Sequence, residues 1–186
     1  MVSLVQLWLP ILLSAVIVFV VSTIIHMALR YHRADYRKVP AEDGLMESLR
    51  KFDLKPGDYV VPCPATMADM KNPEFVAKKE KGPVLIMTVV PSGMPKMGPQ
   101  LVSWFFYLIL VSILAAYVTG RALGPGVHYL KVFRFAGCTA FVAYAIGLWQ
   151  DSIWYGRSWA TTFRYTIDGL IYGLMTAGTF GWLWPR

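Results

Sequence analysis

Asp168 is the residue best placed for chemistry, because it is a carboxylate within an otherwise apolar run, residues 165–184. An ionisable side chain is costly in hydrocarbon, so it needs a polar partner or an aqueous edge. At about 100° per residue, a helix carries four polar side chains on one arc: Asp168, Tyr172, Thr176 and Thr179. This polar stripe could line a path for protons or a solute. The favoured interpretation is an interhelical hydrogen-bond seam, in which Asp168 forms an ion pair with Arg157 or Arg164.

Small residues recur at every fourth position directly after this carboxylate. Such a ladder lets the backbone of another helix approach closely, which drives helix association in lipid. The ladder consists of Gly169, Gly173, Ala177 and Gly181. A second ladder, in an earlier apolar run, consists of Ser112, Ala116 and Gly120. Both sets are predicted helix-packing residues.

The histidines and cysteines offer weaker candidates. His26, near the end of an apolar run, is the most reasonable ligand for a haem or another pigment, because neutral imidazole is a good ligand. A site shared by His26 and His32 is disfavoured, since six residues correspond to about 240° around a continuous helix. Neither Cys63 nor Cys138 belongs to a C-x-x-C pair. We therefore predict no catalytic residue, no metal site and no cofactor, while a bound lipid or pigment stays open.

Four long apolar runs must position these residues, and each approaches or exceeds the roughly 20 residues that cross a hydrocarbon core of about 30 Å. They cover residues 4–29, 101–119, 132–149 and 165–184. Without water to bind the backbone, such runs must be helical. The first helix is expected to continue through residues 30–33 and to end before Pro40. The sequence predicts an all-α membrane protein with four transmembrane helices.

A small α+β insert is predicted between the first two of these helices. Its expected elements are a helix at 42–52, a strand at 59–61, a helix at 73–81 and a strand at 84–90. Two strands are too few for an independent domain, so the insert should rest on the membrane or on another protein. The chain therefore divides into residues 1–38, 39–100 and 101–186.

The positive charges indicate an orientation across the membrane. The chain has a net charge of +7, but residues 1–29 contain no lysine or arginine. Basic residues near the proposed cytoplasmic ends are Arg30, Arg33, Arg37, Lys38, Lys96, Arg157 and Arg164. Those near the opposite ends are fewer: Arg121, Lys131, Arg134 and Arg186. The positive-inside rule then places both termini outside and residues 30–100 in the cytoplasm. The charge is expected to meet anionic lipid rather than nucleic acid.

Several short motifs resemble those of a group of uncharacterised bacterial four-span membrane proteins of similar length. The motifs are residues 54–59, Pro62-Cys63-Pro64, residues 151–157, residues 168–173 and the ending at 180–185. The resemblance covers most of the chain and implies a bacterial inner-membrane location. It implies no activity and no site residue.

Three function classes follow from these patterns. The leading one is a non-catalytic accessory, stabilising or assembly subunit of a larger inner-membrane complex, acting through helix–helix packing. Its partners would be membrane lipids and either other membrane subunits or further copies of the chain. The alternatives are a small oligomeric transporter or channel that uses Asp168 and the hydroxyl stripe, and an integral-membrane enzyme of undefined chemistry.

Overall fold

A computed structural model describes all of residues 1–186. The chain is mostly helical and has one two-stranded sheet. It divides into two compact units, which we describe separately. The helical unit comprises Met1–Arg37 and Lys96–Arg186, and the insert comprises Lys38–Pro95. Two of the three predicted segments, residues 1–38 and 101–186, therefore lie almost entirely in the same unit.

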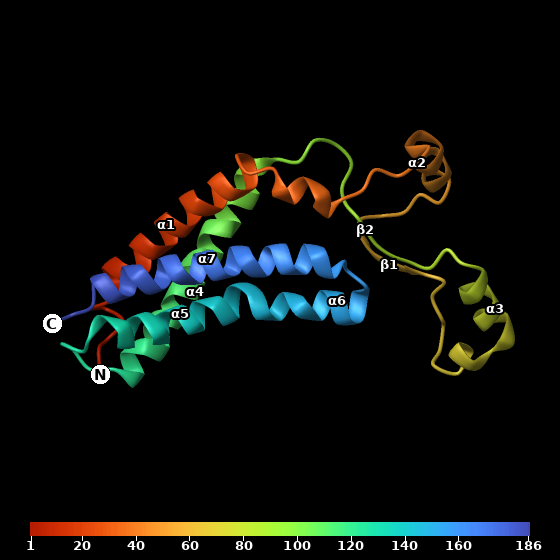
Figure 1. Cartoon of the computed structure of the whole chain (residues 1–186). Helices are drawn as coiled ribbons and strands as arrows, with labels where there is room; N and C mark the ends of the chain where they lie inside the picture. The colour runs from red at the N-terminus through yellow and green to blue at the C-terminus, as the bar shows by residue number, and fades with distance from the viewer. The chain divides into compact units, whose positions relative to one another are not determined.

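Four long helices lie side by side in the helical unit (Figure 1). They are α1 (Trp8–Met27), α4 (Met97–Ala122), α5 (Tyr129–Ala145) and α7 (Trp159–Trp182). Helix α1 packs against α4 and α7, and α5 packs against the same two helices. Both chain termini lie at one end of this unit, where the Val2 amide donates to the Gly120 carbonyl and the Gly126 amide to the Pro185 carbonyl. Successive long helices are consequently antiparallel.

Three helical segments are long and apolar enough to cross a membrane: Trp8–Met27, Met97–Ala122 and Tyr129–Tyr155. Each contains an 18-residue stretch with a high mean hydropathy, 2.6, 2.3 and 1.5 respectively. Apolar side chains such as Val20 and Leu114 are exposed on their outer faces, as expected for contact with lipid. Helix α7 has 24 residues, but its glycines, threonines and Asp168 lower its hydropathy, and it is not among the three. The structure thus supports a membrane protein with three candidate spans.

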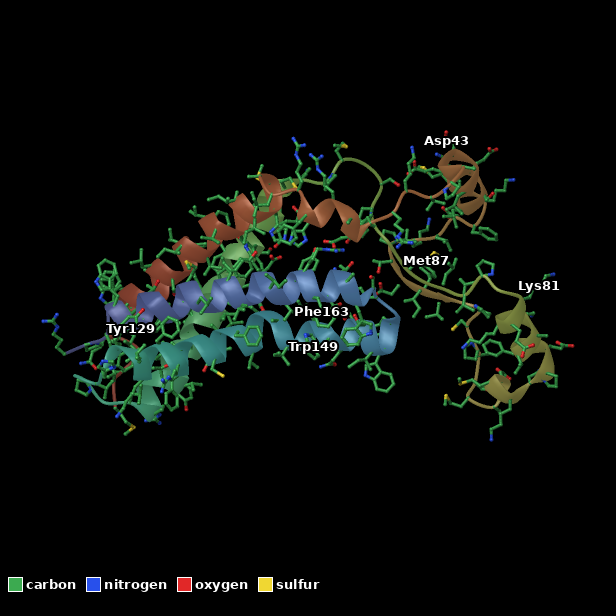
Figure 2. The ribbon with its side chains drawn as sticks, in the orientation of Figure 1. Asp43, Lys81, Met87, Tyr129, Trp149 and Phe163 are labelled. Atoms are coloured by element: carbon green, nitrogen blue, oxygen red, sulfur yellow. The ribbon has the colours of Figure 1, made fainter.

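The connection between the last two long helices is short. Helix α5 passes through a 3-10 turn (Ile146–Leu148) into α6 (Trp149–Tyr155), so most of residues 150–164, which lie between the last two apolar runs of the sequence, are helical. The chain reverses at residues 156–158, where Gly156 adopts a φ of +68° that suits glycine. Trp149 and Phe163 lie on either side of this reversal, with ring centroids 6.1 Å apart (Figure 2).

The end of α1 differs most from the sequence prediction. The helix ends at Met27 and does not continue through residues 30–33. A separate 3-10 helix, η1 (Tyr31–Asp35), follows after a short break. The prediction was wrong because it treated residues 30–33 as a continuation of the apolar helix. The side chains of η1 instead form hydrogen bonds to α7.

The ladder on α7 packs against α5 of the same chain. A Cβ atom added to Gly169 would lie 2.7 Å from the Ala145 Cβ, and one added to Gly173 would lie 3.2 Å from the Phe141 Cβ. On the facing helix, a Cβ atom added to Gly137 would lie 2.8 Å from the Ala177 Cβ. Small residues on both helices therefore permit the close approach.

The ladder on α4 also packs within the chain. Ala116 is fully buried, and the Ser112 hydroxyl lies 2.9 Å from the Ser14 hydroxyl of α1. A Cβ atom added to Gly120 would lie 2.6 Å from the Val2 carbonyl oxygen. Neither ladder is left open for a partner helix.

The insert contains the predicted elements with small changes in their limits. They are α2 (Glu42–Arg50), β1 (Gly57–Val61), α3 (Pro73–Lys81) and β2 (Leu85–Val89). A short 3-10 helix that was not predicted, η2 (Asp69–Lys71), precedes α3. The strands pair antiparallel, with Tyr59 opposite Met87. The Asn72 side chain caps α3 by accepting a hydrogen bond from the Glu74 amide. No residue of the insert is buried.

Candidate functional site

A cluster of polar side chains forms where η1 meets α7. At its centre is Asp168, whose residue is only 1% exposed. The Tyr31 hydroxyl donates a hydrogen bond to Asp168 Oδ1, and His32 Nε2 lies 2.8 Å from Asp168 Oδ2. Both carboxylate oxygens are therefore occupied by side chains from one short segment, which supplies the partners that a buried carboxylate requires.

A second buried carboxylate, Asp35, continues the cluster on the other side of His32. Asp35 Oδ2 lies 2.7 Å from His32 Nδ1, and Arg164 Nε donates to Asp35 Oδ1 at 2.6 Å. Burial acts to raise the pKa of Asp35, but hydrogen bonds from His32 and Arg164 and their positive charge hold that pKa below its usual value. The polar groups thus form one chain from Arg164 through Asp35 and His32 to Asp168.

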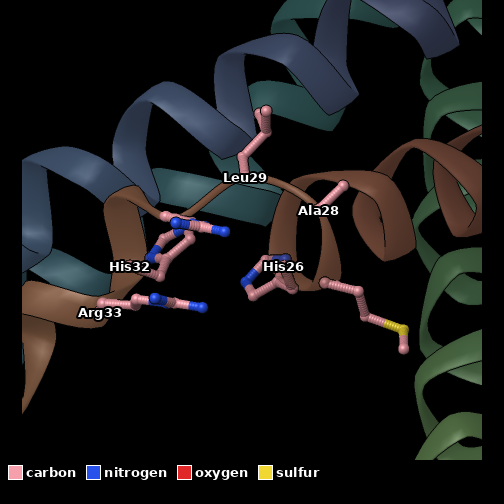
Figure 3. Close-up of a pocket in the computed structure, with 7 residues that line it drawn as sticks. His26, Ala28, Leu29, His32 and Arg33 are labelled. Atoms are coloured by element: carbon pink, nitrogen blue, oxygen red, sulfur yellow. The ribbon is translucent and has the colours of Figure 1, made fainter.

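His26 borders this cluster from the last turn of α1. Its ring stacks on that of His32, with centroids 4.5 Å apart and an interplanar angle of 9°. His26 Nδ1 lies 3.0 Å from the Ser22 carbonyl oxygen. Figure 3 shows the two rings side by side at an open pocket of about 450 Å³. That pocket is lined by His26, Met27, Ala28, Leu29, Arg30, His32 and Arg33.

The arginines predicted to pair with Asp168 pair with other carboxylates. Arg164 binds Asp35, and Arg157 lies 3.5 Å from Asp151. The Arg157 guanidinium also lies over the Tyr165 ring, 4.8 Å from its centroid. The prediction was wrong because the break after α1 brings η1, rather than an arginine, to the open side of Asp168.

The same break overturns the argument against a site shared by His26 and His32. That argument assumed one continuous helix, on which the two residues would point 240° apart. With α1 ending at Met27, the chain turns back and places the rings in contact. One ligand atom from each of His26, His32 and Asp168 now lies within 4.8 Å of the others.

The rest of the polar stripe on α7 is buried but makes mostly local hydrogen bonds. The Thr176 hydroxyl donates to the Tyr172 carbonyl at 3.0 Å, and the Thr179 hydroxyl donates to the Met175 carbonyl at 2.8 Å. The buried Tyr172 hydroxyl has no hydrogen-bond partner. These hydroxyls therefore do not extend the polar chain that begins at Arg164.

Tyr31 and Asp35 were not among the candidates from the sequence, and His32 was considered only to be disfavoured. One feature of the sequence could have indicated a polar site here, namely the concentration of ionisable and aromatic residues between positions 30 and 38, directly after an apolar helix. That pattern favours a membrane boundary, where a helix can end. Nothing in the spacing shows that the segment folds back onto a helix more than a hundred residues later.

The cluster can perform three kinds of chemistry. It can bind η1 to α7 through charged hydrogen bonds, exchange a proton between His32 and Asp168, or hold a metal ion. Its position in an apolar helical unit defines the class as an integral membrane protein with a polar site near one end of its bundle.

Comparison with protein-family models, with curated proteins and with solved structures found no match for this chain.

Proposed function

We propose that this chain is a non-catalytic accessory or assembly subunit of a larger complex in a bacterial inner membrane, and that its insert binds a partner protein. The observation that carries the proposal is the state of Lys38–Pro95. This unit has regular helices and strands, yet none of its residues is buried. A two-stranded sheet is marginally stable in water unless it packs against something else.

The surface of the insert is suited to a protein rather than to anionic lipid. Its basic and acidic residues are equal in number, so the whole net charge of the chain resides in the helical unit. Cross-strand neighbours Val60 and Ile86 are 45% and 52% exposed on one face of the sheet. Phe52 is 70% exposed at the end of α2. Apolar groups on a neutral surface are typical of a protein interface.

The helical unit contributes in a different way from the one that the sequence suggested. Both small-residue ladders are occupied by contacts within the chain, so we assign them to the folding of the bundle. In the proposal, α7 is the fourth span, because it is antiparallel to its neighbours and packs against both α1 and α5. The bundle then anchors the insert at the cytoplasmic face, in agreement with the positive charges of residues 30–37. The bacterial location rests on the family resemblance.

Purification in a mild detergent tests this proposal. The intact chain should co-purify with a discrete partner polypeptide at a fixed ratio. Ile86→Asp should abolish that association, because it places a charge in the middle of the exposed apolar face. The matched control is Lys51→Asp, which changes the charge of the insert more but removes no apolar surface.

Ile86→Asp should leave the helical unit folded, since Ile86 makes no contribution to its core. Circular dichroism and size-exclusion chromatography check that condition. A partner retained at the same ratio by Ile86→Asp would contradict the proposal. A homogeneous preparation of this chain alone that moves a solute across liposomes would favour the transporter alternative instead.

A further inference from the structure

We infer that His26, His32 and Asp168 form a binding site for one divalent transition-metal ion, of which Zn²⁺ is the best match. Two imidazoles and one carboxylate are a common donor set for such ions, with a remaining position open to water or another ligand. One ligand atom of each side chain lies within 4.8 Å of the other two. The inference is independent of the partner-binding function proposed for the insert.

In both histidines Nδ1 contacts an acceptor outside the proposed ligand set, and Nε2 of His32 faces Asp168, another proposed ligand. His26 Nδ1 lies 3.0 Å from the Ser22 carbonyl, and His32 Nδ1 lies 2.7 Å from the Asp35 carboxylate. An acceptor at Nδ1 fixes the proton there and leaves the lone pair on Nε2, which is the usual arrangement behind a metal-bound histidine. Asp35 is itself held by Arg164 at 2.6 Å. The site therefore has a supporting layer of hydrogen bonds as well as ligands.

The distances require only a small closure. Metal–ligand bonds of about 2.0–2.2 Å place tetrahedral ligands about 3.4 Å apart. His32 Nε2 and Asp168 Oδ2 are already 2.8 Å apart, and one ring nitrogen of His26 completes a set of three ligand atoms that lie within 4.8 Å of one another. His26 has the freedom to make the adjustment, because it is exposed at the end of α1 and borders the open pocket. The two rings would tilt from their stacked arrangement so that both nitrogens face the ion.

Charge also suits a cation at this position. Asp168 and Asp35 are both buried, and Arg164 balances only one of them. Arg30 and Arg33 line the neighbouring pocket, but neither forms an ion pair with these carboxylates. A divalent cation bound to Asp168 would supply the positive charge that no lysine or arginine supplies there.

Titration of the full-length protein with metal tests the inference. The protein, purified through a tag without histidine and stripped with a chelator, is titrated with Zn²⁺ by calorimetry and with Co²⁺ by visible absorption. We expect one equivalent to bind, with Co²⁺ giving the spectrum of a nitrogen- and oxygen-ligated ion. His26→Ala and Asp168→Asn should each weaken binding at least tenfold. Asp35→Asn should weaken it by about 10–100-fold, because Asp35 holds η1 and its ligand His32 in place.

His128→Ala is the matched control, because His128 precedes α5 at the other end of the helical unit. It should leave the affinity unchanged. His26 is exposed, so His26→Ala keeps the test valid even if a change at the buried Asp168 impairs folding. Failure to saturate near one equivalent, or equal affinity of His26→Ala and the unaltered protein, would overturn the inference.

Discussion

At the scale of single residues, the absence of side-chain bulk determines how closely α5 and α7 approach. Gly137 and Ala145 on α5 face Ala177 and Gly169 on α7, with potential Cβ separations of 2.8 Å and 2.7 Å. These values are shorter than an ordinary van der Waals contact, so a side chain at either glycine must displace the neighbouring helix. The interface is therefore sensitive to small changes in volume.

Gly169→Leu should destabilise the bundle. The new side chain would meet Ala145 backbone and side-chain atoms, and neither helix can move without disturbing the other contacts. We expect the free energy of unfolding to fall by about 3 kcal/mol, the upper range for added bulk in a packed interface. Unfolding in mixed detergent measures this effect. Leu174→Ile, at a 44% exposed position of α7, is the control and should have little effect on the free energy of unfolding. Equal stability of the two variants would contradict the close packing of α5 against α7.

Residue types were more predictable than residue partners. The ladders and the buried position of Asp168 follow from the sequence, because small residues and a lone carboxylate have restricted uses in lipid. The partners of Asp168 depend on where α1 ends. A span of 137 positions separates Tyr31 from Asp168, and no local pattern encodes that contact. Gly137 was missed for a similar reason, since a small residue gains meaning only from the helix that faces it.

At the scale of elements, η1 is held against α7 mainly by charged hydrogen bonds. Asp35 has a side chain only 2% exposed and accepts from Arg164, whose side chain is 23% exposed. Breaking a buried ion pair by removing one partner typically costs about 3–5 kcal/mol, because the other charge is left without compensation. The attachment of this short element thus depends on very few interactions.

Asp35→Asn should release η1 from α7. Asparagine keeps the size of the side chain but leaves the Arg164 guanidinium without its counter-charge. Amide hydrogen exchange should accelerate at least tenfold in Tyr31–Asp35, while the middle of α7 stays protected. Asp53→Asn is the matched control, because it breaks an exposed pair with Lys55, which contributes little. Unchanged exchange in η1 would show that other contacts hold it.

The elements themselves were largely predictable, and their ends were less so. Apolar periodicity and the turn residues located α3 and β2 within one residue of their limits. The end of α1 was misplaced because the polar residues after it are compatible with helix when considered alone. Tertiary hydrogen bonds to α7 decide the conformation there, and they lie beyond local propensity.

At the scale of the whole molecule, the chain combines an apolar bundle with an insert that lacks a core. The excess positive charge belongs to the bundle and gathers around residues 30–37 and 157–164. The other end, where the two termini lie, has fewer basic residues. The positive-inside rule predicts that the richer end faces the cytoplasm, as in the orientation that we propose.

Cysteine labelling tests this orientation. Cys63 in the insert is exposed and free, so it needs no engineering once Cys138 is replaced by serine. In intact cells, a membrane-impermeant maleimide should label a cysteine introduced at Pro125 but should leave Cys63 unlabelled until the membrane is permeabilised. The Pro125 variant is made in a Cys63→Ser background so that each site is read separately. Labelling of Cys63 in intact cells would contradict the proposed orientation.

The central claim, that the insert is the partner-binding surface, is tested most directly by photo-crosslinking in native membranes. A photoreactive amino acid placed at Ile86 samples the exposed face of the insert, and one at Leu174 samples the exposed face of α7. We expect the photoreactive group at Ile86 to form one discrete protein adduct, which Val60→Asp on the paired strand should abolish. The photoreactive group at Leu174 should form adducts with lipid. A protein adduct from Leu174 with none from Ile86 would contradict the account and return the partner interface to the helices.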